Sequence, residues 1–126
     1  MASPAELRAA ARTFALSLPE AWEDFPWGES TIKVRKKVFV FLGNYAPEGV
    51  PDDVLRVSAK LPQSMTDVLA LPFATPTGYG LGKHGWVSLR IEAGVTVALE
   101  DLLGWIEESY RAVAPKTLVK ALHASR

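Results

Sequence analysis

Residues Pro76–Arg90 read PTGYGLGKHGWVSLR, in which four glycines precede an alternating run of apolar and polar residues. Glycine loses more conformational entropy on folding than other residues, so a glycine cluster indicates backbone with positive φ or a close approach. These glycines surround Tyr79, Lys83 and His84, and the alternation predicts a strand over Trp86–Glu92. We therefore expect a tight loop that presents a cation and an imidazole beside aromatic rings.

The chain before this loop predicts a helix, three strands and a short second helix. Ser3 followed by Glu6 is typical of a capping box at a helix start. Alternation indicates half-buried strands, and one wholly apolar segment predicts a central strand covered on both faces. The predicted segments are a helix over 4–17, strands over 30–35, 38–42 and 55–61, and a helix over 62–71.

The connections carry further expectations. Residues 20–29 predict an irregular bridge whose aromatics cover one end of the core, and the alternative, an exposed aromatic binding surface, stays open. The turn Arg35-Lys36-Lys37 has no Gly or Asn, which disfavours a two-residue turn with positive φ. The loop over 43–53 is rich in proline and glycine, which is typical of a mobile connection.

After the glycine-rich loop, a helix is predicted from residue 96 to Pro115, with a short helical turn over 116–123. Gly104 within that helix predicts a close approach by a neighbouring element. The predicted order is α-β-β-β-α-β-α. It favours an α+β class, a single domain over 1–126 with a mainly antiparallel sheet and helices packed on it.

Composition excludes several classes of protein. Apolar residues at 48% and charged residues at 22% argue against disorder, and a net charge of zero means that binding to a polyanion requires a local cationic patch. With no cysteine and two histidines, we predict no disulfide, metal site or cofactor. No signal peptide or membrane-spanning run is recognised, which predicts a cytoplasmic protein. We also expect a monomer or weak dimer.

Two stretches are candidates for chemistry or binding. The glycine-rich loop leads into a strand rather than a helix, so a phosphate-binding loop is not predicted. Lys83 and His84 resemble an acid–base pair, but no carboxylate lies within a few residues to orient them, and a solvated loop tip without catalysis is favoured.

The second candidate is a basic run in the predicted hairpin. Its cations are typical of phosphate contacts, with Tyr79 or Trp86 to stack on a base, and the alternative is a solvated rim that protects the sheet edge. The run comprises Lys33, Arg35, Lys36 and Lys37.

The order of short motifs resembles the MmcQ/YjbR-like family of small bacterial proteins. The matching residues are Leu18-Pro19 with Glu23, Pro26-Trp27-Gly28, Thr75-Pro76, Gly78-Tyr79, Lys83, Trp86 and Glu108-Ser109-Tyr110. The chain departs from the family at the Arg35-Lys36-Lys37 turn, where relatives often have glycine, and in the proline-rich loop over 46–53.

The resemblance implies a fold similar to frataxin-like and secretion-chaperone-like domains, and no catalytic or metal-binding set. It also implies DNA binding through two β-hairpin wings, here Lys33–Lys37 and Tyr79–Trp86, with Lys83 as the matched basic residue. The alternative partner is a protein or small ligand bound by the loop over Gly78–Trp86 in a non-enzymatic adaptor. A third possibility, an enzyme that uses His84 and Lys83, is the least favoured.

Overall fold

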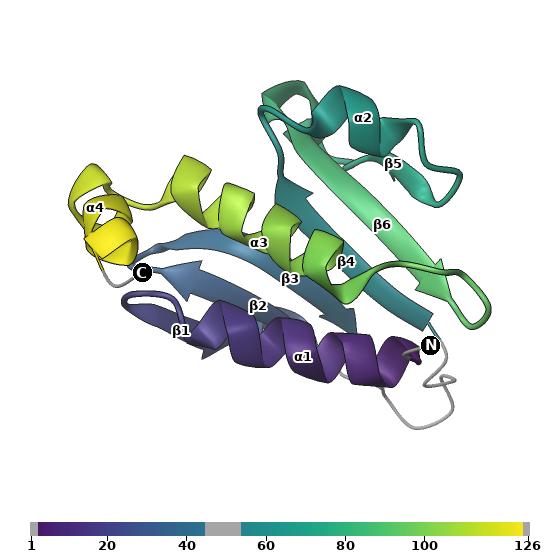
Figure 1. Ribbon diagram of the computed structural model, residues 1–126, viewed down its shortest axis with the longest axis horizontal. Helices are drawn as coiled ribbons and strands as arrows, with labels where there is room; N and C mark the ends of the chain where they lie inside the picture. Colours follow the sequence, from purple (N-terminus) through teal and green to yellow (C-terminus); the bar gives the residue numbers. More distant parts are fainter. Residues whose placement is uncertain (1–2, 45–53, 125–126) are drawn as a thin grey trace.

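The computed structural model describes residues 3–44 and 54–124, and one sheet with helices on it organises them. The elements are α1 (Pro4–Leu16), β1 (Ala21–Asp24), the short 3₁₀ helix η1 (Pro26–Gly28), β2 (Glu29–Val34), β3 (Lys37–Asn44), β4 (Val54–Lys60), α2 (Met65–Leu69), β5 (Ala74–Pro76), the 3₁₀ helix η2 (Leu81–His84), β6 (Trp86–Glu92), α3 (Leu99–Val113) and α4 (Lys116–Ala124). Every pairing in the six-stranded sheet is antiparallel, in the order β1-β2-β3-β4-β6-β5 (Figure 1).

The α+β class and the antiparallel sheet are confirmed, while the predicted order of elements is simpler than the observed one. The observed order contains three elements that the predicted order lacks: the strand β1, the short strand β5 and the separate helix α4. The helices α1 and α3 lie side by side and pack on β3 and β4 (Figure 1). The side chains of the described residues that face these helices form one continuous core.

The first helix begins where the sequence predicts. Ser3 Oγ accepts a hydrogen bond from the Glu6 amide at 3.1 Å, and Glu6 Oε1 accepts one from the Ser3 amide at 3.4 Å. This capping box satisfies two of the amides that a helix start leaves unpaired. Leu7, Ala11 and Ala15 then recur at helical spacing and are buried against the sheet.

Residues 20–29 are not the predicted irregular bridge. β1 pairs antiparallel with β2, so its side chains alternate between the helix-covered face and the opposite face of the sheet. Trp22 is 43% exposed and Phe25 is 47% exposed, so the prediction that they cover the core is wrong. The side chain of Trp27 lies outside the described part of the structure.

The turn between β2 and β3 also differs from the expectation. Val34 pairs with Lys37, which leaves a two-residue connection, and Arg35 has a positive φ of 56°. Such a backbone is unfavourable for a side chain larger than glycine or asparagine. The strand pairing on both sides of the turn imposes this conformation. Arg35 Nε also lies 3.5 Å from Glu20 Oε1, which forms an ion pair.

A β-bulge at Phe39 shapes the centre of the sheet. Ile32 pairs with Val40 while Lys33 pairs with Val38, so Phe39 is the extra residue. Its ring is buried and meets Tyr110 of α3 edge to face, with centroids 5.2 Å apart. β3 is central as predicted, but among the described residues the helices α1 and α3 cover a single face of it.

The remaining elements differ from their predictions in extent. α2 is shorter than 62–71, and α4 reaches Ala124. Gly104 in α3 is exposed, and a Cβ there would meet nothing within 4 Å, so the predicted close approach is wrong. The proline-rich segment over 45–53 lies outside the described residues.

Candidate nucleic-acid interface

Register places both predicted wings at the same end of the sheet. Val40 of β3 pairs with Ala59 of β4, and Ala59 pairs with Val87 of β6. The starts of β3 and β6 therefore lie at the end where β4 finishes. Only β4 separates the strands that carry the two loops, the β2–β3 turn and the glycine-rich loop before β6 (Figure 1).

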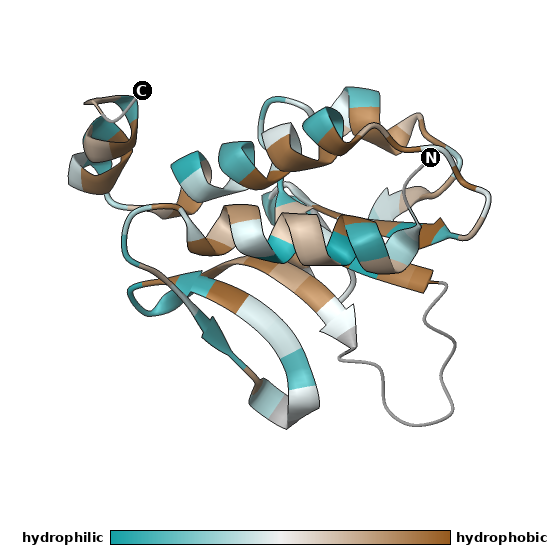
Figure 2. Ribbon diagram, turned by 60° about the horizontal axis from the view of Figure 1, so that its bottom comes forward, coloured by the Kyte–Doolittle hydropathy of each residue, from teal (hydrophilic) through white to brown (hydrophobic). Residues whose placement is uncertain are grey.

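In the β2–β3 turn, the four cations divide into two kinds. Lys33 Nζ lies 2.7 Å from Asp24 Oδ2, and Arg35 pairs with Glu20. Lys36 and Lys37 are exposed and form no ion pair within residues 3–44 and 54–124. The tip of this hydrophilic turn (Figure 2) thus presents two cations that are available to a ligand.

The backbone of the glycine-rich loop is tied to its neighbours by hydrogen bonds. The Gly82 amide donates to the Thr77 carbonyl at 2.9 Å, and the Leu61 amide donates to the Gly85 carbonyl at 2.8 Å. A Cβ at Gly82 would lie 3.0 Å from Pro76 and Thr77, so glycine permits this close return of the chain. The loop therefore holds its outward side chains on a fixed backbone.

Tyr79, Lys83 and His84 are all exposed on this tip, and the ring of Tyr79 is fully exposed. Tyr79 has a positive φ of 59°, which is unfavourable for a residue with a large side chain. No described packing or hydrogen bond of the Tyr79 side chain explains this backbone strain. Strain of this kind concentrates at functional positions.

Trp86 does not present a free ring. It is 8% exposed and packs edge to face on Phe41, with centroids 5.5 Å apart on the face of the sheet away from α1 and α3. Of the two aromatics predicted to stack on a base, Tyr79 is therefore the accessible one. Trp86 instead supports the strand from which the loop departs.

The structure reveals a segregation of charge that the neutral total conceals. Ends of elements at the side of the two loops carry mostly cations, and the ends at the opposite side carry mostly acids; the exceptions are Asp67 at the first side and Arg56 and Arg90 at the second. Described cations at the end with the loops are Arg35, Lys36, Lys37, Lys60, Lys83, Arg111, Lys116 and Lys120. Described acids at the opposite end are Glu6, Glu29, Glu92, Glu100 and Asp101.

The acids that lie at the cationic end are mostly engaged within the protein. Glu20 pairs with Arg35, and Glu107 pairs with Arg111 at 3.0 Å. Glu108 accepts hydrogen bonds from the amides of Gln63 and Ser64, each at 3.0 Å. The described cations at this end therefore outnumber the acids, Asp67 included, and a polyanion requires a local cationic patch of this kind.

The sequence left open an exposed aromatic surface over residues 20–29 but did not connect Trp22 with the basic turn. Its Nε1 donates to the Arg35 carbonyl at 2.7 Å, and Lys33 Nζ lies 5.2 Å from its ring centroid. The ring is thereby fixed beside the basic turn. The available signal was that Trp22 and Asp24 alternate with Ala21 and Glu23 along the chain. The segment is only four residues long and lies near prolines, so a strand was not predicted there.

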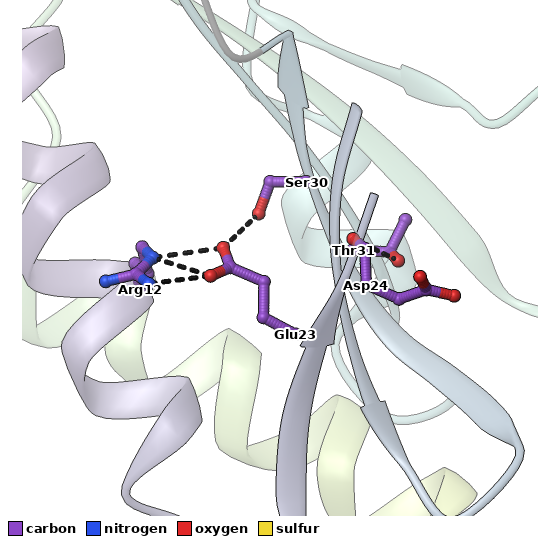
Figure 3. Close-up of polar contacts among 5 residues, drawn as sticks. All are labelled: Arg12, Glu23, Asp24, Ser30 and Thr31. Carbon is purple, nitrogen blue, oxygen red and sulfur yellow. Dashed lines mark hydrogen bonds and ion pairs between the residues drawn. The ribbon is translucent and has the colours of Figure 1, made fainter. Parts of the chain in front are cut away.

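The arrangement of β1 shows why Trp22 faces outward. Figure 3 shows Glu23 directed toward Arg12 and Ser30, and Asp24 on the other side of the strands beside Thr31. Arg12 belongs to α1, so Glu23 lies on the helix-covered face. Because side chains alternate along a strand, Trp22 and Asp24 lie on the open face.

Lys83 and His84 have no hydrogen bond or ion pair to a described carboxylate that would orient them. In the described ranges no group of three His, Asp or Glu side chains is arranged to hold a metal ion. Within those ranges, too, no helix has the length and apolar character needed to cross a membrane.

A hollow of about 680 Å³ lies toward the other end of β6, away from the glycine-rich loop. It is lined by Pro72, Phe73, Thr75, Arg90, Glu92, Val95 and Thr96. Arg90 and Glu92 pair with each other at 2.7 Å across its wall. The residues that line this hollow do not include the loop over Gly78–Trp86, by which a small-ligand adaptor was expected to bind.

Comparison with known proteins yields a family model and a solved structure. The model of the YjbR family matches residues 16–112. A crystal structure of the Deinococcus radiodurans protein DR2400, with a DUF419 domain, superposes with a TM-score of 0.69 at 23% identity, covering 93% of this chain and 85% of that one. At that identity the likeness shows the fold alone. No curated protein matches the chain.

Proposed function

The chain belongs to the YjbR family, and from this premise we propose that it binds DNA through the two loops at the cationic end of the sheet. Lys36 and Lys37 at one loop and Lys83 at the other contact phosphates, and Tyr79 packs against a sugar or base. The role is one of binding rather than catalysis.

The segregation of charge is the observation that carries this proposal. A neutral protein gains nothing from whole-molecule attraction to a polyanion, so binding depends on where the cations lie. Here the accessible lysines gather where the two loops project, and three neighbouring acids, Glu20, Glu107 and Glu108, are engaged in ion pairs or a cap. The acidic end points away from a ligand bound there.

The spacing of the loops suits a backbone ligand. Strands lie ~4.8 Å apart, so the centres of the β2–β3 turn and the β5–β6 loop are separated by roughly 14 Å across the sheet, before its twist is added. The major groove of B-DNA is ~12 Å wide, with phosphates on both rims. Two loops at this separation reach phosphates on two strands, or phosphates that are not adjacent along one strand.

Charge neutralisation at the turn tests the proposal. Anisotropy of labelled DNA is measured at about 50 and 200 mM salt for the wild type and for Lys36→Gln/Lys37→Gln. Each lost phosphate contact makes the slope of log affinity against log salt concentration shallower by about 0.9 on duplex DNA. The variant lacks two lysines, so its slope should be shallower by about twice that amount, and it should bind every sequence more weakly. An unchanged slope would remove this turn from the interface.

A control of opposite charge separates local from global attraction. Glu100→Gln/Asp101→Asn raises the net charge at the far end, where both side chains are exposed. Local contacts predict unchanged affinity for this control. Affinity that rises as much as the lysine variant falls would show a whole-molecule effect, and no binding at the lower salt would end the proposal.

A further inference from the structure

Trp22 is an exposed aromatic ring that the fold holds in one orientation. Three contacts fix it: the strand pairing with Lys33, the 2.7 Å hydrogen bond from Nε1 to the Arg35 carbonyl, and Lys33 Nζ at 5.2 Å from the centroid. With these contacts made, 43% of the residue is still exposed. An exposed ring with so little freedom loses little entropy when a ligand stacks on it.

The setting of the ring indicates the ligand. Its indole donates a hydrogen bond directly to the backbone of the turn that carries Lys36 and Lys37, so the ring lies beside those exposed cations. An aromatic face beside cations that track a backbone is the combination that binds single-stranded nucleic acid. In a duplex, the faces of internal bases are stacked on each other and are not available to the ring.

We propose that Trp22 stacks on an unpaired base of single-stranded DNA whose phosphates lie along Lys36 and Lys37. This inference rests on the proposed function and deepens it, because it names the form of DNA that the open face of the sheet prefers. The indole and the turn form one clamp: the ring takes the base, and the lysines take the flanking phosphates.

The charged groups around the ring allow this. Asp24 shares the open face, but its carboxylate is held by Lys33 Nζ at 2.7 Å. Glu20 is paired with Arg35, and Glu23 lies on the opposite face with Arg12. The acids near Trp22 are therefore each matched by a cation, while Lys36 and Lys37 remain for phosphate.

The test compares labelled oligo(dT) of about 12 nucleotides with the oligo(dT)·oligo(dA) duplex of the same length. The wild type should bind the single strand more tightly. Stacking on one base is worth roughly 5- to 150-fold in affinity, so Trp22→Ala should lose at least about fivefold on oligo(dT) and nothing on the duplex. Trp22→Phe keeps a ring without the Nε1 donor and should retain most of the affinity.

A matched control comes from the same edge of the sheet. Phe25 follows β1 at its other end and is similarly exposed at 47%, but lies at the end away from the cations. Phe25→Ala should leave both affinities unchanged. Thermal melting of each variant shows whether the fold is intact, and Trp22→Phe supplies the comparison if Trp22→Ala unfolds.

Four results would overturn the inference. Equal loss on both forms, or Trp22→Phe as weak as Trp22→Ala, would mean that the indole only anchors the turn. Unchanged affinity of Trp22→Ala would exclude stacking, and tighter binding to oligo(rU) than to oligo(dT) would assign the face to RNA. Absence of binding to both DNA forms would instead refute the proposed function itself.

Discussion

Arg12 of α1 and Glu23 of β1 form a forked ion pair that ties the first helix to the edge of the sheet. Arg12 Nε lies 3.0 Å from both carboxylate oxygens, and Nη2 lies 2.6 Å from Oε1 (Figure 3). Ser30 Oγ donates to the second oxygen at 2.7 Å. The Glu23 side chain is only 10% exposed, so this carboxylate depends on its partners.

Replacing Glu23 should destabilise the domain. In Glu23→Gln the amide replaces the charge opposite Arg12, and hydrogen bonds to a charged group are worth about 1.5–3 kcal/mol. We expect the free energy of unfolding, measured by urea titration, to fall by about that amount with an unchanged m-value. Glu92→Gln breaks an exposed ion pair with Arg90 and should cost less than about 1 kcal/mol. If Glu23→Gln and Glu92→Gln lowered the free energy of unfolding equally, the ion pair between α1 and β1 would contribute no more than an exposed one.

Stability should also fall in acid. The hydrogen bond from Arg12 lowers the pKa of Glu23, against the opposing effect of burial, and the hydrogen bond from Lys33 lowers the pKa of Asp24. A carboxylate whose folded pKa lies below its unfolded value, ~4.3 for Glu, stabilises the fold above that value and loses the effect as pH falls through the folded pKa.

Urea titrations from pH 7 down to about pH 3 measure this loss. The wild type should lose stability below roughly pH 4.3. In Glu23→Gln the free energy of unfolding should decline less steeply as the pH falls. Part of the decline that remains comes from protonation of Asp24. A Glu23→Gln curve parallel to that of the wild type would show that Glu23 does not carry this pH dependence.

Ser109 should be important for stability although it is a single small polar residue. Its buried hydroxyl donates to the Phe39 carbonyl at the bulge and accepts from the Lys60 amide at 2.8 Å. Ser109→Ala removes a partner from two backbone groups at once, and each unsatisfied buried group costs about 1–3 kcal/mol. Ser17→Ala, which removes an exposed bond to the Phe14 carbonyl, should change the free energy of unfolding by less than ~0.5 kcal/mol.

Two glycine substitutions should have opposite effects. Gly104 is exposed within α3 and has open space around it, so Gly104→Ala should stabilise the protein by about 0.5–1 kcal/mol. Gly43 has a φ of 68°, and a Cβ there would lie 2.8 Å from the Arg56 carbonyl oxygen. Gly43→Ala should therefore destabilise the protein. Urea unfolding of the two variants measures whether the free energy of unfolding rises for Gly104→Ala and falls for Gly43→Ala. Destabilisation by Gly104→Ala would indicate a packing role for that glycine.

Regular, periodic segments of this chain could be predicted from sequence. The capping box at Ser3 and the alternation over Trp86–Glu92 depend on local residues, and both appear as expected. β1 could not be predicted, because four residues become a strand only when β2 offers a partner. The positive φ of Arg35 likewise follows from the strand pairing around it and not from its own preference.

The candidate site follows the same division. Lys36, Lys37 and Lys83 could be identified from the sequence, because cations in predicted turns and loops are expected to be exposed. The burial of Trp86 depends on Phe41, a contact between strands that are separated by β4. The role of Trp22 depends on a hydrogen bond to Arg35, which lies thirteen residues away in the chain. Neither can be predicted without the register of the sheet.

Tyr79 offers a test in which stability and binding should move in opposite directions. A left-handed backbone costs a non-glycine residue about 1–2 kcal/mol, and the fully exposed ring recovers little of that by packing. Asparagine tolerates this conformation, so Tyr79→Asn should raise the free energy of unfolding by up to about 1 kcal/mol. It should also weaken DNA binding severalfold, since one stacking ring is lost.

Tyr79→Phe separates the ring from the hydroxyl. It keeps the aromatic face and the strained backbone, so we expect its stability and its DNA affinity to stay close to those of the wild type. Urea unfolding and DNA anisotropy on the three proteins give both quantities. A more stable Tyr79→Asn with undiminished affinity would mean that the exposed ring has no part in binding DNA, and the contact from this loop would reduce to Lys83.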